Sequence, residues 1–172
     1  VMTMNAADAS PESRLPALLC DGAHGSMATA ESCTGGGVTA RLTSVSGSSA
    51  YVMGGIVAYS NEAKIALLGV DPAIIATQGA VSKPCALAMA AGARRAFGTT
   101  WAVSTSGIAG PTGATPTKPV GLVYIAVAGP DGAVSEEHVF PGDRAAVTAA
   151  ATERALMLLV ESVEGGAGQG RS

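Results

Sequence analysis

The chain has 172 residues, enough for one domain with a hydrophobic core that needs no disulfide or metal support. Its ten Lys and Arg residues are scattered and its net charge is −3, which argues against a nucleic-acid-binding protein. The sequence contains no apolar run near the roughly 18 residues that a membrane span needs, and its N-terminal segment lacks a signal-peptide pattern. We therefore expect a soluble, cytoplasmic protein without nucleic-acid or membrane partners.

The cysteines support the same expectation. The chain has three cysteines, an odd number, and they are widely spaced: Cys20, Cys33 and Cys85. Its only histidines are His24 and His138. This pattern indicates neither a disulfide framework nor a metal site. Because 48% of the residues are apolar and only 13% are charged, we expect part of the surface to be covered in a homo-oligomer, a dimer or larger.

In chain order, the first predicted element is a short helix over residues 10–22, ended by Gly22. A short strand over residues 26–32 runs into "CTGGG", after which "GGGVTARLTSV" shows helical spacing of its apolar residues. A second strand follows over residues 50–60. Its glycine pair, in "YVMGGIVAYS", indicates a bulge or a close approach of another backbone segment.

Three helices are predicted next from their capping residues. Ser60 or Asn61 caps "NEAKIALLG", Asp71 caps "DPAIIATQG", and Ser82 opens "SKPCALAMAAGARRAFG", which Gly98 ends. The helix that Ser82 opens is rich in strong helix formers.

The remaining elements are strands and one long helix. A third strand over residues 100–106 enters "GIAGPTGATPTKPVG", a loop long enough to suggest a functional role. The turn "GPDG" joins two strands, "GLVYIAVAG" and "AVSEEHVFPG", into an antiparallel hairpin. A final helix runs from Asp143 to about Val163. We expect one domain over residues 1–172, with an ordered core at about 12–163 and flexible tails at 1–11 and 164–172.

This element order predicts an α/β layered fold. The sheet should be mixed and mainly parallel, with the antiparallel hairpin late in the chain. The loops after Ala30, Tyr59 and Ser106 would then gather at one edge of the sheet, where ligands bind in open α/β sheets. The sequence thus predicts the place of the functional site.

The glycine-rich turn "CTGGG" allows two interpretations. Its main-chain amides and the following helix N-terminus can bind a phosphate or an oxyanion, but the turn can also be purely structural. It lacks both the GxxxxGK[ST] pattern of nucleoside-triphosphate loops and the GxGxxG pattern of dinucleotide loops.

Nucleophilic catalysis is the second interpretation of this turn. Ser32 lies where a strand turns into a helix, a place that exposes a nucleophile beside main-chain amides. His24 and His138 are poorly placed as its base, and a lone histidine in such positions is more often structural. Lys64 is better placed, and a desolvated lysine can act as a base near neutral pH. Its helical position alone nevertheless favours an exposed lysine.

Other residues leave further alternatives open. Cys33 can be a thiolate nucleophile at a helix N-terminus or a small packing residue. Arg144 can bind a phosphate, or it can form a solvated helix start with Asp143; Lys118 offers a second cation in the long loop. These residues together indicate a small anionic ligand and hydrolase-like or transferase chemistry.

Five blocks in order carry a family resemblance over roughly residues 15–160: "TAESCTGG", "GSSAYVMGGIVAYSNEAKIALLGV", "GAVS", "SGIAGPTGATPTKPVG" and "FPGDR". With them the chain resembles the CinA C-terminal domain family, the nicotinamide-nucleotide amidases of bacteria, in a stand-alone form. The resemblance implies a three-layer α/β/α domain that hydrolyses the carboxamide of nicotinamide mononucleotide to nicotinic acid mononucleotide and ammonia. It implies no metal and no organic cofactor.

The resemblance also implies roles for residues. Ser32 would be the nucleophile and Lys64 its base, in an acyl-enzyme mechanism, with Tyr59 beside them; this replaces the expectation of an exposed Lys64. The residues that would bind the substrate or its oxyanion lie in the turn and in three later blocks: Cys33, Thr34, Gly35, Gly36, Asn61, Ser106, Gly107 and Arg144.

Some residues depart from the family pattern. In the loop that contains residues 111–119, residues 110–116 read "GPTGATP", where relatives commonly carry more glycine or an aspartate. Gln78 and Lys83 replace a frequent histidine and acidic residue. These changes leave the reaction type better indicated than the substrate. Two alternatives remain: a non-catalytic nucleotide-binding or regulatory module linked to competence or DNA damage, and an amidase that uses Cys33.

Overall fold

The structure, a computed structural model, describes residues 9–20 and 25–169. These residues form a five-stranded sheet in the order β2-β1-β3-β4-β5. β1 pairs in parallel with β2 and β3, while β4 pairs antiparallel with β3 and β5, so that β4 alone of the five opposes the others. The strands are β1 (Met27–Glu31), β2 (Val52–Val57), β3 (Trp101–Gly107), β4 (Leu122–Gly129) and β5 (Gly132–Val139).

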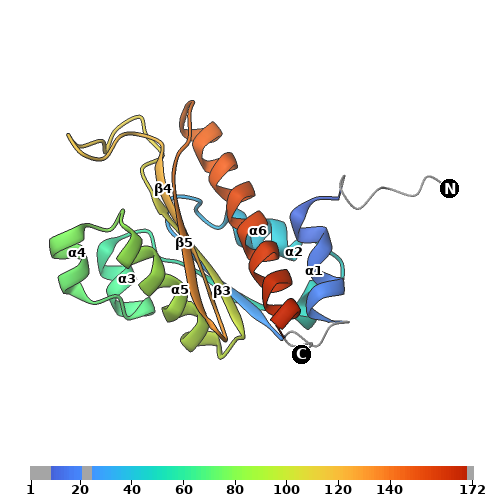
Figure 1. Cartoon of the computed structure of the whole chain (residues 1–172). Helices are drawn as coiled ribbons and strands as arrows, with labels where there is room; N and C mark the ends of the chain where they lie inside the picture. Colours follow the sequence, from blue (N-terminus) through green and yellow to red (C-terminus); the bar gives the residue numbers. More distant parts are fainter. Residues whose placement is uncertain (1–8, 21–24, 170–172) are drawn as a thin grey trace.

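Helices cover both faces of this sheet (Figure 1). The helices on one face are α1 (Pro11–Leu19), α2 (Gly37–Thr43) and α6 (Arg144–Gln169). Those on the other face are α3 (Asn61–Leu68), α4 (Pro72–Gln78) and α5 (Lys83–Phe97), and a single 3₁₀ turn, η1 (Ser48–Ala50), precedes β2. The predicted three-layer α/β/α fold with a mixed sheet is therefore confirmed.

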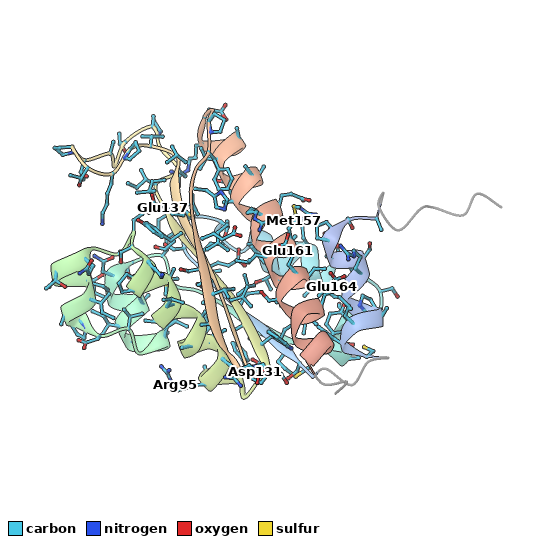
Figure 2. The ribbon with its side chains drawn as sticks, viewed as in Figure 1. Arg95, Asp131, Glu137, Met157, Glu161 and Glu164 are labelled. Carbon is cyan, nitrogen blue, oxygen red and sulfur yellow. The ribbon has the colours of Figure 1, made fainter. Side chains whose placement is uncertain are left out.

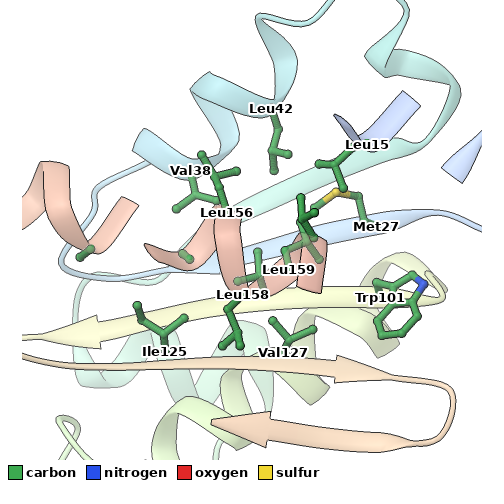
Figure 3. Close-up of a cluster of buried hydrophobic side chains, with 14 of the residues drawn as sticks. Leu15, Met27, Val38, Leu42, Trp101, Ile125, Val127, Leu156, Leu158 and Leu159 are labelled. Atoms are coloured by element: carbon green, nitrogen blue, oxygen red, sulfur yellow. The ribbon is translucent and has the colours of Figure 1, made fainter. Parts of the chain in front are cut away.

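Each face of the sheet has its own hydrophobic core. The larger core packs α1, α2 and α6 on the sheet, and Figure 3 shows Leu156 and Leu159 of α6 beside Val38 and Leu42 of α2. The core on the α5 face is built mainly from small side chains. A small residue also lets α5 lie close to α3: a Cβ added at Gly92 would lie 2.0 Å from the Leu68 carbonyl oxygen.

The glycine pair of β2 behaves as predicted. The register between β1 and β2 shifts so that Met27 faces Val52 and Ala28 faces Gly54, which leaves one extra residue on β2. At Gly55 a Cβ would lie 2.2 Å from the Thr29 hydroxyl oxygen, so only glycine fits here. Both the bulge and the close approach are present.

The predicted caps are present at the starts of α3, α4 and α5 and at the ends of α3 and α5. Ser60, Asp71 and Ser82 accept hydrogen bonds from main-chain amides of the first turns of α3, α4 and α5, and Gly69 and Gly98 end α3 and α5 in the left-handed region.

The last helix is longer than predicted. α6 continues six residues past Val163, so residues 164–169 are helical rather than a loose tail. Glu164, labelled on α6 in Figure 2, pairs with Arg14 of α1 and so joins this segment of α6 to α1. The first helix is shorter than predicted: α1 ends at Leu19, with Cys20 as its C-cap, rather than at Gly22. Gly22 itself, His24 and the outer parts of both predicted tails lie outside the described residues. Within the described residues, no helix combines the length and apolarity needed to cross a membrane.

Candidate active site

Ser32 and Lys64 meet at the carboxyl edge of the parallel strands. Ser32 follows β1 directly, and Lys64 lies on the first helical turn after β2. The Lys64 Nζ atom lies 3.0 Å from Ser32 Oγ, within hydrogen-bond distance. The chain crosses from one side of β1 to the other between β2 and β3, so this edge is the switch point of the sheet, where ligands bind in open α/β folds.

Lys64 is buried, and its hydrogen-bond partners are uncharged. Its side chain is 1% exposed, and Nζ also donates to the main-chain carbonyls of Ala58 at 3.0 Å and Tyr59 at 3.1 Å. Burial disfavours the ammonium form and lowers the Lys64 pKa below its ordinary value. In the neutral form two N–H groups donate to the two carbonyls, which leaves the lone pair for the Ser32 hydroxyl proton. The geometry allows Lys64, when neutral, to accept a proton from Ser32.

Cys33 differs from Ser32 in its electrostatic surroundings. The Cys33 side chain is buried, and burial raises the pKa of its thiol to about 11. A thiol with this pKa is protonated at neutral pH and is a poor nucleophile. Cys33 nevertheless lines the same cavity as Ser32.

A buried side chain, that of Glu31, caps the helix that follows the turn between β1 and α2. Gly36 at the helix start has φ +100° and no side chain to cap α2. The buried Glu31 carboxylate takes that role and accepts hydrogen bonds from the amides of Val38 at 2.8 Å and Thr39 at 2.9 Å. These helix amides already donate to the Glu31 carboxylate, which argues against the interpretation of "CTGGG" as a phosphate-binding loop.

A cavity of about 290 Å³ opens onto Ser32 and Lys64. Its walls come from the turn after β1, the start of α3, the segment before α5 and the loop after β3. The lining residues are Ser32, Cys33, Tyr59, Asn61, Lys64, Ala80, Val81, Ser106, Gly107, Ile108, Ala109, Gly110, Thr112, Gly113 and Arg144. Lys64 and Arg144 are its charged residues, and no carboxylate is among these lining side chains.

Arg144 and Tyr59 close one side of this cavity. The Arg144 guanidinium donates to the Tyr59 hydroxyl at 2.7 Å and to the Gly110 carbonyl at 2.8 Å, which joins the start of α6 to the long loop. The Tyr59 side chain is 61% exposed, and its contact with Lys64 is made by its main-chain carbonyl. A larger apolar groove adjoins the cavity at Ala109 and Arg144.

The structure brings most of the predicted site residues together. Ser32, Lys64 and Tyr59 line the cavity with five of the predicted binding residues: Cys33, Asn61, Ser106, Gly107 and Arg144. Ser106 also donates from Oγ to the Ala80 carbonyl at 2.7 Å, which holds another wall of the cavity in place.

Three predicted binding residues do not line it: Thr34, Gly35 and Gly36. Thr34 is buried, and its hydroxyl donates to Glu31 at 2.6 Å and lies 2.7 Å from Thr105 Oγ1. The two glycines have φ values of +58° and +100° and shape the turn.

The other candidates lie away from the cavity. His138 is on β5, where it contacts Glu136 and stacks on Phe140. Lys118 donates to the Gln78 carbonyl at 2.6 Å and fastens the long loop to the end of α4. Within residues 9–20 and 25–169, no three His, Cys, Asp or Glu side chains gather as a metal site would require.

Sequence reasoning missed Glu31 and the two carbonyls that hold Lys64. Ala58 and Tyr59 contribute main-chain atoms, which leave no side-chain signal. Glu31 did leave one: it is a lone acidic residue at the end of an apolar buried strand, before a helix start that lacks a capping side chain.

Known proteins resemble this chain in sequence and in fold. The CinA C-terminal domain family matches residues 12–163. A CinA-like protein of Mycolicibacterium vanbaalenii is 55% identical over 142 residues, 82% of this chain and 34% of that protein. One of Anaeromyxobacter dehalogenans is 53% identical over 133 residues, 77% of this chain and 33% of that protein. The chain thus spans about a third of the length of these relatives.

Solved structures share the fold of this chain over almost their full length. The competence/damage inducible protein CihA of Agrobacterium tumefaciens matches with a TM-score of 0.84 and 37% identity, covering 93% of this chain and 98% of that one. A CinA superfamily protein of Enterobacter cloacae matches with a TM-score of 0.86 and 29% identity, covering 95% and 99%. On this evidence the chain belongs to the CinA C-terminal domain family.

Proposed function

We propose that the protein hydrolyses the carboxamide of nicotinamide mononucleotide to nicotinic acid mononucleotide and ammonia. The observation that carries this proposal is the buried pair of Ser32 and Lys64 at the base of a cavity. Lys64 has uncharged hydrogen-bond partners and a lowered pKa, as a general base for a serine requires.

The proposed reaction begins with acyl transfer to the enzyme. Neutral Lys64 takes the Ser32 proton, and Oγ attacks the carboxamide carbon to give a tetrahedral oxyanion. Lys64 then returns the proton to the leaving nitrogen, and ammonia departs from the acyl-enzyme. Water, deprotonated by Lys64, attacks the ester, and the carboxylate product leaves as the proton returns to Ser32.

The main-chain amides of the turn are the proposed oxyanion donors. The Ser32 amide is occupied, because it donates to the Thr105 carbonyl at 3.0 Å, and the Gly35 amide donates to the Ser32 carbonyl. Among the described residues, the Cys33 and Thr34 amides donate to no main-chain carbonyl. The amide that follows the nucleophile is the usual oxyanion donor at a strand-to-helix turn.

The charge of the cavity supports a phosphorylated substrate. With Lys64 neutral, Arg144 is the remaining cation among the lining residues, and a guanidinium suits a phosphate. The groove beyond Arg144 leaves room for the part of a nucleotide that extends from the carboxamide. No resident metal or cofactor takes part in the steps proposed.

Ammonia release from nicotinamide mononucleotide is the direct test. We expect turnover by the wild-type chain, loss of turnover in Ser32→Ala, and retention in Cys33→Ala. Loss in Cys33→Ala with retention in Ser32→Ala would instead assign the chemistry to the thiol. Micromolar binding of the nucleotide without turnover would indicate a binding module.

A further inference from the structure

Glu31 is a buried carboxylate that the proposed reaction does not use. It is 1% exposed and accepts four hydrogen bonds. Oε1 accepts from Thr34 Oγ1 at 2.6 Å and from the Val38 amide at 2.8 Å. Oε2 accepts from the Thr39 amide at 2.9 Å and from Thr39 Oγ1 at 2.6 Å. All four donors are uncharged and come from the turn and first residues of α2.

Burying the Glu31 carboxylate without a cation requires donors for each oxygen, and here two amides and two hydroxyls supply them. Gly36, with φ +100°, offers no capping side chain, so Glu31 also satisfies the amides at the start of α2. The Glu31 contacts have a second effect, because they fasten α2 and the turn to the end of β1.

The same contacts reach the nucleophile through Thr34 and Thr105. Thr34 Oγ1 joins the Glu31 carboxylate to Thr105 Oγ1, which lies 2.7 Å away. The Thr105 carbonyl accepts from the Ser32 amide at 3.0 Å, and the Ser32 carbonyl accepts from the Gly35 amide at 3.0 Å. The Ser32 amide is thus tied through Thr105 and Thr34 to Glu31, while Gly35 of the same turn holds the Ser32 carbonyl.

We propose that Glu31 is a positioning residue for Ser32: it fixes the turn over residues 32–36 so that Ser32 Oγ faces Lys64 and the oxyanion donors are in place. This inference rests on the proposed serine chemistry. It differs from that proposal because Glu31 touches neither the substrate nor the reacting atoms. It acts through the main chain of the turn.

Glu31→Gln is the sharpest variant, because it keeps the shape and replaces one acceptor oxygen by a donor. That NH₂ group would face an amide or a hydroxyl that now donates to the carboxylate, and the turn must shift. A misplacement near 1 Å costs about 100-fold in rate, so we expect kcat to fall about 100-fold while KM stays within about threefold. Glu136→Gln, the same change on β5 beside Arg154, is the matched control and should keep kcat.

Thr34→Val is the second variant, in case Glu31→Gln fails to fold. It removes the link between Glu31 and Thr105 but leaves the amides of Val38 and Thr39 capped, so α2 remains intact. We expect kcat to fall about tenfold, since one hydrogen bond to a charged group is lost. Circular dichroism at the assay temperature verifies that each variant is folded.

A second readout separates this inference from the substrate assignment. Acetylation of Ser32 by p-nitrophenyl acetate, followed by mass spectrometry, reports on the nucleophile whether or not nicotinamide mononucleotide is turned over. Slower acetylation in folded Glu31→Gln and Thr34→Val, but not in Glu136→Gln, supports the positioning role. Wild-type rates in the two turn variants overturn it, and so does a wild-type chain in which Ser32 is not acetylated. If Ser32 of the wild-type chain is acetylated but nicotinamide mononucleotide is not turned over, only the proposed substrate is refuted.

Discussion

The Lys64 amine lies 3.0 Å from the Ser32 hydroxyl oxygen, and its other two hydrogen-bond partners are main-chain carbonyls. A neutral amine can donate its two N–H groups to the carbonyls and accept the Ser32 proton with its lone pair. The arrangement therefore allows Lys64 to act as a base once it is neutral, and it makes the Lys64 titration a direct test of the proposed mechanism.

The first prediction concerns the pH dependence of the rate. Only neutral Lys64 accepts the Ser32 proton, so kcat/KM should rise with pH and level off above the Lys64 pKa. Because burial lowers this pKa, the midpoint should lie below 10.5, the ordinary lysine value. Steady-state rates across the alkaline range measure it. A midpoint at or above 10.5, or a Lys64→Met variant with the wild-type rate, would contradict the assignment of the base.

The second prediction concerns stability. Lys64 binds its proton more tightly in the unfolded chain than in the folded one, so between the two pKa values the unfolded chain holds more protons. In that pH window the free energy of unfolding should rise with pH, and the penalty for burying the lysine should vanish above 10.5.

Lys64→Met isolates this contribution, because every other titrating group is common to the two proteins. The wild type should gain unfolding free energy relative to Lys64→Met as pH rises through the window. Urea unfolding at several alkaline pH values measures both proteins. A difference that stays constant with pH would show that the Lys64 pKa is the same in the folded and unfolded chains.

The third prediction concerns Cys33. Burial raises the pKa of its thiol to about 11, whereas Cys20 is exposed. Iodoacetamide at pH 8 should therefore label Cys20 well before Cys33, as peptide mass spectrometry can show. Since the thiol is protonated at neutral pH and takes no part in the proposed reaction, Cys33→Ala should keep kcat within about threefold. Rapid labelling of Cys33 with parallel loss of activity would reverse the roles of the two adjacent side chains.

Local sequence signals predicted the elements of this fold well. The caps Ser60, Asp71 and Ser82 act within one helical turn, and the "GPDG" turn joins strands that are adjacent in sequence. Such features depend on neighbouring residues only, so a pattern along the chain reveals them. The end of α6 is different, because Glu164 pairs with Arg14 from the other end of the chain.

The site was predictable to a smaller extent. The position of Lys64 makes it a candidate base, but its helical spacing favours an exposed side chain, and only the family resemblance decides between the two. The side chain is in fact 1% exposed. Its burial arises because α3 packs on α5, a contact that no local pattern encodes. The link from Glu31 through Thr34 to Thr105 likewise spans two strands that are neighbours only in the folded sheet.

The last prediction concerns Arg144. Its guanidinium is fixed at the cavity by the Tyr59 hydroxyl and the Gly110 carbonyl, where it can meet the phosphate of a nucleotide. A charge-assisted hydrogen bond is worth about 2 kcal/mol, so Arg144→Met should raise KM for nicotinamide mononucleotide about 30-fold and leave kcat within about threefold.

A substrate without the phosphate separates binding of the anion from support of the loop. For nicotinamide riboside, Arg144→Met should leave kcat/KM unchanged, because the lost cation has no phosphate to bind. Tyr59→Phe is the matched control: it removes the hydroxyl that Arg144 contacts but keeps the cation, so its KM for the mononucleotide should change far less. Equal losses for both substrates in Arg144→Met would mean that Arg144 acts by holding the Gly110 loop, and the phosphate would then bind elsewhere in the groove.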